Sequence, residues 1–240
     1  MRNMYLVAVV VTLVVSAAVV SAEPSMRGYS GLLMVPTTDT LSDGGYNVAI
    51  SSSELSDWDD RAYIANFGLQ DGLEAGVWWW HPAGGSGVVP SKLLVIGNET
   101  LLNIKYRFES GTPGRASLAL GVSDVTDEID TAVYFVASKD VGQPIGTTID
   151  GKPISRLTLH GGIGGGWIDD FFFGLEARLG DRLTLIAEHF NDDLSVGARL
   201  RLWQHFAVDA GYIDTKDWSA NLSYNYPLGT AGALQPIIGD

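Results

Sequence analysis

Residues 102–108 read Leu-Asn-Ile-Lys-Tyr-Arg-Phe, and this heptapeptide decides the fold. A large apolar side chain occupies every second position, and a polar or charged side chain occupies each position between. Because a strand turns successive side chains to opposite faces, the segment predicts a β-strand with one oily face and one charged face.

The same period of two recurs along the chain from residue 45 onward, most clearly in 194–202 and 218–226. Turn-forming residues separate the segments, as expected between strands. The candidate strands are 45–53, 61–69, 73–80, 102–108, 115–123, 131–138, 155–164, 170–179, 183–190, 194–202, 205–213 and 218–226. An even number of such segments is typical of outer-membrane barrels. We therefore predict an all-β fold, a closed antiparallel up-and-down transmembrane β-barrel of about 12 strands over residues 45–226.

The connections indicate antiparallel neighbours. Four are tight and rich in residues that accept turn dihedrals, namely 70–72, 180–182, 191–193 and 214–217. Two are long, His81 to Glu99 and Asp140 to Pro153. The strand order puts these two at opposite ends of a barrel, so either a strand is miscounted or one periplasmic connection is unusually long.

The first 22 residues have the layout of a secretory signal peptide. Arg2 precedes an uncharged apolar run from Tyr5 to Val20, and small residues follow up to Ala22, after which we expect cleavage. An uncleaved helical anchor is the alternative. After residue 22, no second run of about 18 apolar residues exists, so a mature chain that spans a membrane must do so with strands.

The segments that flank the predicted barrel have different expected roles. Residues 23–44 contain a Gly-rich turn and Pro36, and we expect them to plug or seal the periplasmic end. Residues 227–240 form a C-terminal tail, so the chain does not end in the aromatic residue that barrel-assembly machinery reads. Tyr224 and Tyr226 are candidates for an internal version of that signal, unless the tail docks inside the pore.

Composition excludes several classes of function. The formal net charge is −13, and loss of residues 1–22 removes only Arg2, which gives −13 − 1 = −14. Nucleic acid is therefore not an expected partner, because phosphate binding needs clustered Lys and Arg. The chain has no cysteine, which excludes disulfides, thiolate metal sites and a lipidated N-terminal cysteine.

The polar face of the strands carries Gly, Ala, Ser and Asn with scattered ions, a mixture that suits a narrow polar lumen. Glu188 and Arg199 share the inward phase of neighbouring strands, which suggests an ion-pair network inside the barrel. Ile186 shares the phase of Glu188, so alternation leaves the facing of that strand open. The predicted network is structural or pore-lining and comprises Lys105, Arg107, Glu176, Arg178, Glu188, Arg199, Arg201 and Asp209.

Aromatic residues cluster near the ends of the predicted strands. Amphipathic rings at those heights form interfacial girdles in membrane barrels, although core aromatics of a soluble protein look alike in sequence. The predicted interfacial residues are Trp78, Trp79, Trp80, Trp167, Trp203, Trp218, Tyr224 and Tyr226.

Three stretches together resemble the YjbH-like outer-membrane barrels associated with exopolysaccharide production. They are residues 28–37 with 41–46, residues 159–164, and residues 187–190 with 196–201. The resemblance spans about residues 28–226. It implies a barrel with a part in exopolysaccharide production or export, although members of that family are often larger and have more than one barrel.

The sequence lacks the common catalytic and metal-binding motifs. There is no Gly-x-Ser-x-Gly elbow, and the four histidines stand singly, so His160 and His189 are interpreted as wall or rim residues. The acidic turns Asp57–Asp60 and Asp124–Asp130 do not match an EF-hand loop. We therefore expect no cofactor, no specific metal site and no enzymatic activity.

Three hypotheses follow from these observations. The first is a small outer-membrane barrel with a structural or transport role, whose partners are the lipid bilayer, the barrel-assembly machinery and exopolysaccharide or its export proteins. The second is a secreted soluble barrel or sandwich with a dry interior that binds a small ligand. The third is a barrel enzyme acting on lipid or glycan, with Glu176 and Glu188 as general acid or base.

Overall fold

The computed structural model describes residues 22–52, 61–81, 99–110, 115–141, 155–180 and 182–226. The expected signal peptide before residue 22 and the expected tail 227–240 lie outside these residues. The described part contains twelve strands: β1 (Tyr46–Ser52), β2 (Arg61–Gln70), β3 (Leu73–His81), β4 (Glu99–Glu109), β5 (Ser117–Ser123), β6 (Ala132–Asp140), β7 (Ser155–Gly165), β8 (Phe171–Leu179), β9 (Leu183–Phe190), β10 (Asp193–Arg201), β11 (Phe206–Ile213) and β12 (Asp217–Tyr226).

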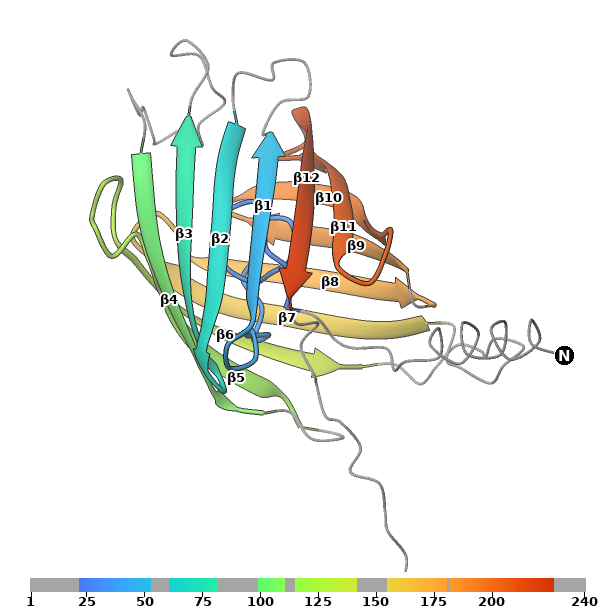
Figure 1. Ribbon diagram of the computed structural model, residues 1–240, viewed down its shortest axis with the longest axis horizontal. Coiled ribbons are helices and arrows are strands. Elements are labelled where there is room, and N and C mark those ends of the chain that lie inside the picture. The colour runs from blue at the N-terminus through green and yellow to red at the C-terminus, as the bar shows by residue number, and fades with distance from the viewer. Residues whose placement is uncertain are drawn as a thin grey trace, which may run out of the picture.

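The strands form one closed ring (Figure 1). Each strand pairs antiparallel with its neighbours in the chain, and β1 pairs with β12 from Tyr46↔Tyr226 to Ser52↔Ala220. Closure leaves no strand with unpaired backbone groups along its edge. The predicted all-β, closed, up-and-down barrel is confirmed, and each predicted strand coincides with an observed one. Within the described residues, no helix is long and apolar enough to cross a membrane.

The ring has two ends. We call the end where β1 starts and β12 finishes the terminal end, and the opposite one the loop end. With twelve antiparallel strands, the connection from β3 to β4 lies at the loop end and the one from β6 to β7 at the terminal end. The two long connections are therefore at opposite ends without any miscounted strand.

Every strand turns large apolar side chains to the outside of the ring. These side chains are between about one third and two thirds exposed although they alternate with buried neighbours. One from each strand in order is Val48, Tyr63, Trp79, Leu102, Leu120, Val133, Leu159, Phe171, Leu185, Leu194, Phe206 and Trp218. The oily face recognised in residues 102–108 is thus the outer face of the whole barrel.

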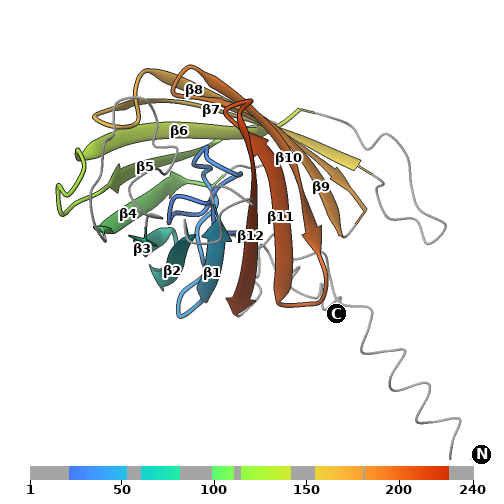
Figure 2. The ribbon, with the colours of Figure 1, turned by 90° about the horizontal axis from the view of Figure 1, so that it is seen from above.

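The segment before β1 lies inside the ring. Figure 2 shows its blue trace enclosed by the strands. Residues 22–41 are buried throughout, except for the half-buried Arg27 and Asp39. We call residues 22–44 the plug: residues 22–41 occupy the lumen that the strands enclose, and residues 42–44 form the more exposed turn that leads into β1.

Glycines make room for the interior. A Cβ added at Gly162, on β7, would overlap the ring of Phe172 and the carbonyl oxygen of Phe135. The next residue toward the N-terminus, Gly161, faces outward, and a Cβ there would come no closer than 3.5 Å, to Cδ1 of Phe173. The two glycines are adjacent in sequence but differ in the space around them.

This difference predicts opposite tolerances for the same substitution. Gly162→Ala should lower the free energy of unfolding by about 1–3 kcal/mol, the usual effect of overpacking. Gly161→Ala should change it by less than about 0.5 kcal/mol. Urea unfolding in detergent, followed by tryptophan fluorescence, measures both. Equal losses of stability in the two variants would contradict the inward position of Gly162 and the outward position of Gly161.

Candidate functional site

The plug has little regular secondary structure, so few of its backbone groups pair with one another. Its recorded bridges are two isolated ones, Pro24 with Ser30 and Gly31 with Pro36. Buried backbone N–H and C=O groups need hydrogen-bond partners, because leaving one unsatisfied costs about 1–3 kcal/mol. The inward side chains of the strands supply many of these partners.

On β3 and β4, Glu74 and Lys105 hold the plug together. Oε1 of Glu74 accepts the backbone N–H of Ser30 at 3.0 Å, and Oε2 accepts the Ser30 hydroxyl at 2.6 Å and the N–H of Leu41 at 3.0 Å. Nζ of Lys105 donates to the carbonyl of Ser30 at 2.7 Å and lies 3.7 Å from Glu74 Oε1. Since Glu74 and Lys105 are only 2% and 1% exposed, they form a buried ion pair that also binds peptide.

On β9, Glu188 binds the middle of the plug. Its two carboxylate oxygens accept the backbone N–H groups of Met34 at 2.7 Å and Val35 at 3.1 Å. Hydrogen bonds from N–H groups to a carboxylate are stronger than those to a neutral acceptor. Glu188 is buried, so both oxygens are taken up by the peptide rather than by solvent.

On β10 and β11, Arg199 and Asp209 form a bidentate pair. Nε of Arg199 lies 2.7 Å from Oδ1 of Asp209, and Nη2 lies 3.0 Å from Oδ2. The same guanidinium donates to the carbonyls of Gly31 at 3.3 Å and Leu32 at 3.2 Å. The pair thus satisfies its own charges and also binds the plug backbone.

At the terminal end, the first residues of the plug are fixed to the last strands. Glu23 lies 3.0 Å from Arg201 and accepts a hydrogen bond of 2.6 Å from Asn225. Nδ2 of Asn47 donates to the carbonyl of Ala22 at 2.9 Å. The plug therefore enters the lumen at the terminal end, where β1 also starts.

An apolar cluster completes the contact. Tyr29 and residues 32–35 of the plug belong to one buried group with inward side chains such as Phe172, Ile186 and Phe190. This explains why Ile186 shares the phase of Glu188: both face the plug, one through a methyl-rich surface and the other through hydrogen bonds.

The residues of the predicted network fall into separate pairs. Arg199 joins Asp209, Arg201 joins Glu23, and Lys105 joins Glu74. Arg178 lies 3.2 Å from Glu176, whereas Glu188 binds plug N–H groups. Arg107 is half-buried on β4, and its Nε has no hydrogen-bond partner among the described residues.

Several residues that hold the plug were not predicted. Glu74 is the clearest: it lies directly opposite Lys105 in the β3–β4 register, but a long connection separates the two strands, so the register is not readable from sequence. Asn103 donates to the carbonyl of Gly28 at 2.8 Å. Asn103 and Asn225 lie at inward positions of their strands, and this alternation could have identified them in the sequence as lumen residues.

The predicted interfacial aromatics divide into two groups. Trp79, Trp203, Trp218 and Tyr226 are exposed, and Tyr224 is half-buried on the same outward phase as Tyr226. The prediction is wrong for Trp78 and Trp80, which are 4% and 6% exposed and stack inside the barrel at 5.8 Å. Strict alternation forces them inward because Trp79 between them faces out.

Trp167 also lies away from the outer face, so its interfacial assignment is wrong. Its ring packs against the interior cluster, and the guanidinium of Arg27 lies 5.9 Å from its centroid and 5.4 Å from that of Trp78. Close by in the β11–β12 turn, burial raises the pKa of the Asp214 carboxyl, and the Arg27 charge partly offsets this. The plug thus reaches toward the loop end at Arg27.

Two of the residues considered for chemistry, His160 and Asp124, make hydrogen bonds within the barrel. His160 faces inward, with Nδ1 2.7 Å from the Ser138 hydroxyl, and His189 lies in the wall on β9. Asp124 accepts the backbone N–H groups of Glu128, Ile129 and Asp130. The other acidic turn, 57–60, lies outside the described residues. In the described part of the chain, no group of three or more His, Asp or Glu side chains is arranged to hold a metal.

No protein-family model matches the chain, and no curated protein sequence matches it either.

The buried pair on β10 and β11 predicts a large loss of stability when one partner is removed. Arg199→Met leaves the buried Asp209 carboxylate without its cation and should lower the free energy of unfolding by about 3–5 kcal/mol. The matched control is Arg156→Met, because Arg156 pairs with Asp140 at the terminal end of the barrel, where both side chains are nearly half exposed. That change should cost no more than about 1 kcal/mol.

Urea unfolding of the two variants in the same detergent gives this comparison. Limited proteolysis adds a local readout, since a released plug should be cut ahead of the strands in Arg199→Met alone. A loss of stability in Arg156→Met as large as in Arg199→Met would contradict the role assigned to Arg199.

Proposed function

We propose that this chain is a β-barrel of the bacterial outer membrane, closed by its own N-terminal plug, with a structural or transport role in the cell envelope. One observation carries the proposal: all twelve strands turn large apolar side chains outward and polar side chains toward a filled lumen. A signal-like N-terminus supports it, since an exported chain is required.

The energetics favour lipid over water outside the ring. Burying one large apolar side chain away from water is worth about 1.5–3 kcal/mol, so an outer surface built from one or more such residues per strand is costly in water. Soluble monomers rarely expose apolar patches beyond a few hundred Å². The soluble ligand-binding alternative also expects a space inside for a ligand, where this barrel holds the plug.

The plug supports the proposed role. We propose that the terminal end faces the periplasm, from which an exported chain inserts. A lumen occupied by a fixed peptide favours a structural element or a gated conduit over a permanently open pore. The enzymatic alternative gains no support from Glu188, whose carboxylate binds plug N–H groups, or from Glu176, which pairs with Arg178.

The resemblance to YjbH-like barrels extends the proposal to exopolysaccharide production or export. In that setting, the partners are the lipid bilayer, the barrel-assembly machinery and exopolysaccharide or the proteins that export it. Transport through the barrel would require displacement of the plug.

Cell fractionation and a gel-shift assay test the membrane assignment. We expect the folded protein in the outer-membrane fraction, extractable only with detergent, and migrating differently before and after boiling because a closed barrel resists dodecyl sulfate until heated. Recovery from the soluble periplasm, with a mobility that boiling does not change, would contradict the proposal.

A further inference from the structure

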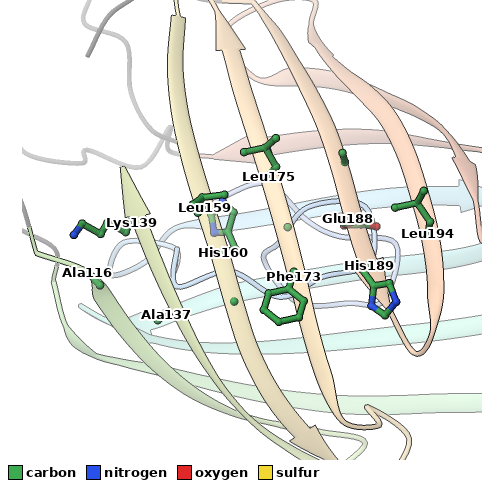
Figure 3. Close-up of a pocket in the computed structure, with 13 residues that line it drawn as sticks. Ala116, Ala137, Lys139, Leu159, His160, Phe173, Leu175, Glu188, His189 and Leu194 are labelled. Atoms are coloured by element: carbon green, nitrogen blue, oxygen red, sulfur yellow. The ribbon is translucent and has the colours of Figure 1, made fainter. Parts of the chain in front are cut away.

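The outer face of the barrel has a hollow of about 550 Å³ that extends from Ala116, just before β5, to Leu194 on β10 (Figure 3). Its apolar rim includes Leu159, Phe173 and Leu194, each about half exposed. Figure 3 shows Lys139 at one side of this hollow and His189 with Leu194 at the other. We call it the wall hollow.

Small outward residues create the wall hollow. Ala137 on β6 is paired with Gly161 on β7, so two neighbouring strands have almost no side chain on their outer face there. Ala187 on β9 is a third small residue of the lining, and the larger Phe173 and Leu175 of β8 stand between it and Gly161. The wall hollow therefore has two low areas, one at Ala137 and Gly161 and one at Ala187, with large apolar side chains around and between them.

One cation borders this apolar surface. Lys139 lines the wall hollow, is exposed, and lies one residue before the end of β6, at the terminal end of the barrel. The next residue, Asp140, has the opposite phase and is bound by Arg156 and Thr158. Within the described residues, no carboxylate is recorded in ion-pair contact with Lys139.

We propose that the wall hollow binds an anionic glycerophospholipid of the periplasmic leaflet, with one acyl chain packed against Ala137, Phe173 and Ala187 and the phosphate at Lys139. This inference rests on the proposed membrane location. An apolar hollow with a single cation at the level of a membrane surface complements a lipid whose chain is apolar and whose headgroup is negative.

The size of the wall hollow favours a lipid chain over a protein partner. Its volume lies within the range of about 300–1,000 Å³ that is typical of small-molecule sites. A stable protein interface buries about 800 Å² on each partner, whereas this hollow has the volume of a small-molecule site.

Native mass spectrometry of the folded protein in detergent tests the inference, with phosphatidylglycerol and phosphatidylcholine of identical acyl chains as probes. Wild type should retain phosphatidylglycerol in preference. Ala187→Leu fills the low area on β9 and should lower retention of both lipids by about tenfold, as expected for the loss of two buried methylene contacts. Lys139→Gln should lower only phosphatidylglycerol binding, by about fivefold, since one interfacial Lys is worth about 1 kcal/mol.

The matched control is Ala65→Leu, an outward alanine on β2 that does not line the wall hollow. It should bind both lipids as wild type does. Equal retention by Ala187→Leu and Ala65→Leu would overturn the inference. So would a wild-type dimer, measured by light scattering, that Ala187→Leu converts to a monomer while Ala65→Leu does not, because the hollow would then be an interface between copies.

These outcomes are distinct from a failure of the proposed function. A protein that inserts into membranes and shows the heat-dependent gel shift but retains no lipid disproves only the lipid site. A protein that stays soluble without detergent disproves the membrane assignment itself.

Discussion

A buried peptide without regular secondary structure must have its backbone polar groups satisfied, and the architecture of this barrel follows from that constraint. A closed ring of twelve strands encloses a lumen, and residues 22–41 occupy it. Glu74, Glu188 and Arg199 bind backbone groups of this segment, and each lies on a different part of the wall. These three charged residues of the lumen are therefore better understood as peptide-binding groups than as a pore lining.

Pairing and peptide binding reinforce each other at these sites. A buried ion pair alone contributes little or even destabilises, because desolvation offsets the attraction. Here Arg199 and Asp209 neutralise each other, and the remaining donors of Arg199 reach plug carbonyls. Lys105 and Glu74 follow the same pattern at Ser30. Breaking either pair would leave a buried charge and also free part of the plug.

The twelve strands were predictable from sequence, and so was the facing of all but the strand 183–190, because alternation is local and recurs along the chain. The heptapeptide 102–108 shows which face is apolar, and neighbouring segments agree. The same rule, applied strictly, would also have placed Trp78 and Trp80 inside, since Trp79 faces out between them. Their clustering suggested a girdle, and that interpretation ignored the period.

The contacts of the plug were not predictable, because they join positions far apart in the chain. Glu188 meets Met34 across a separation of 154 residues, and Glu74 meets Lys105 across a long connection that hides the register. The shared facing of Ile186 and Glu188 was also hard to interpret, because the plug residues that they contact lie far away in the sequence. The inward position of Ile186 becomes reasonable only when the apolar residues of the plug are placed opposite it.

Conductance across a planar lipid bilayer tests the central claim, a membrane barrel kept closed by its bound N-terminal segment. The comparison is between wild type and the double variant Glu188→Ala/Arg199→Ala, each first shown to be folded by its gel shift on heating. We expect no steady current for wild type and frequent openings for the variant, since about 3 kcal/mol lost from the bound plug raises the open population about a hundredfold. A steady pore in wild type, with the same current in the variant, would contradict the central claim.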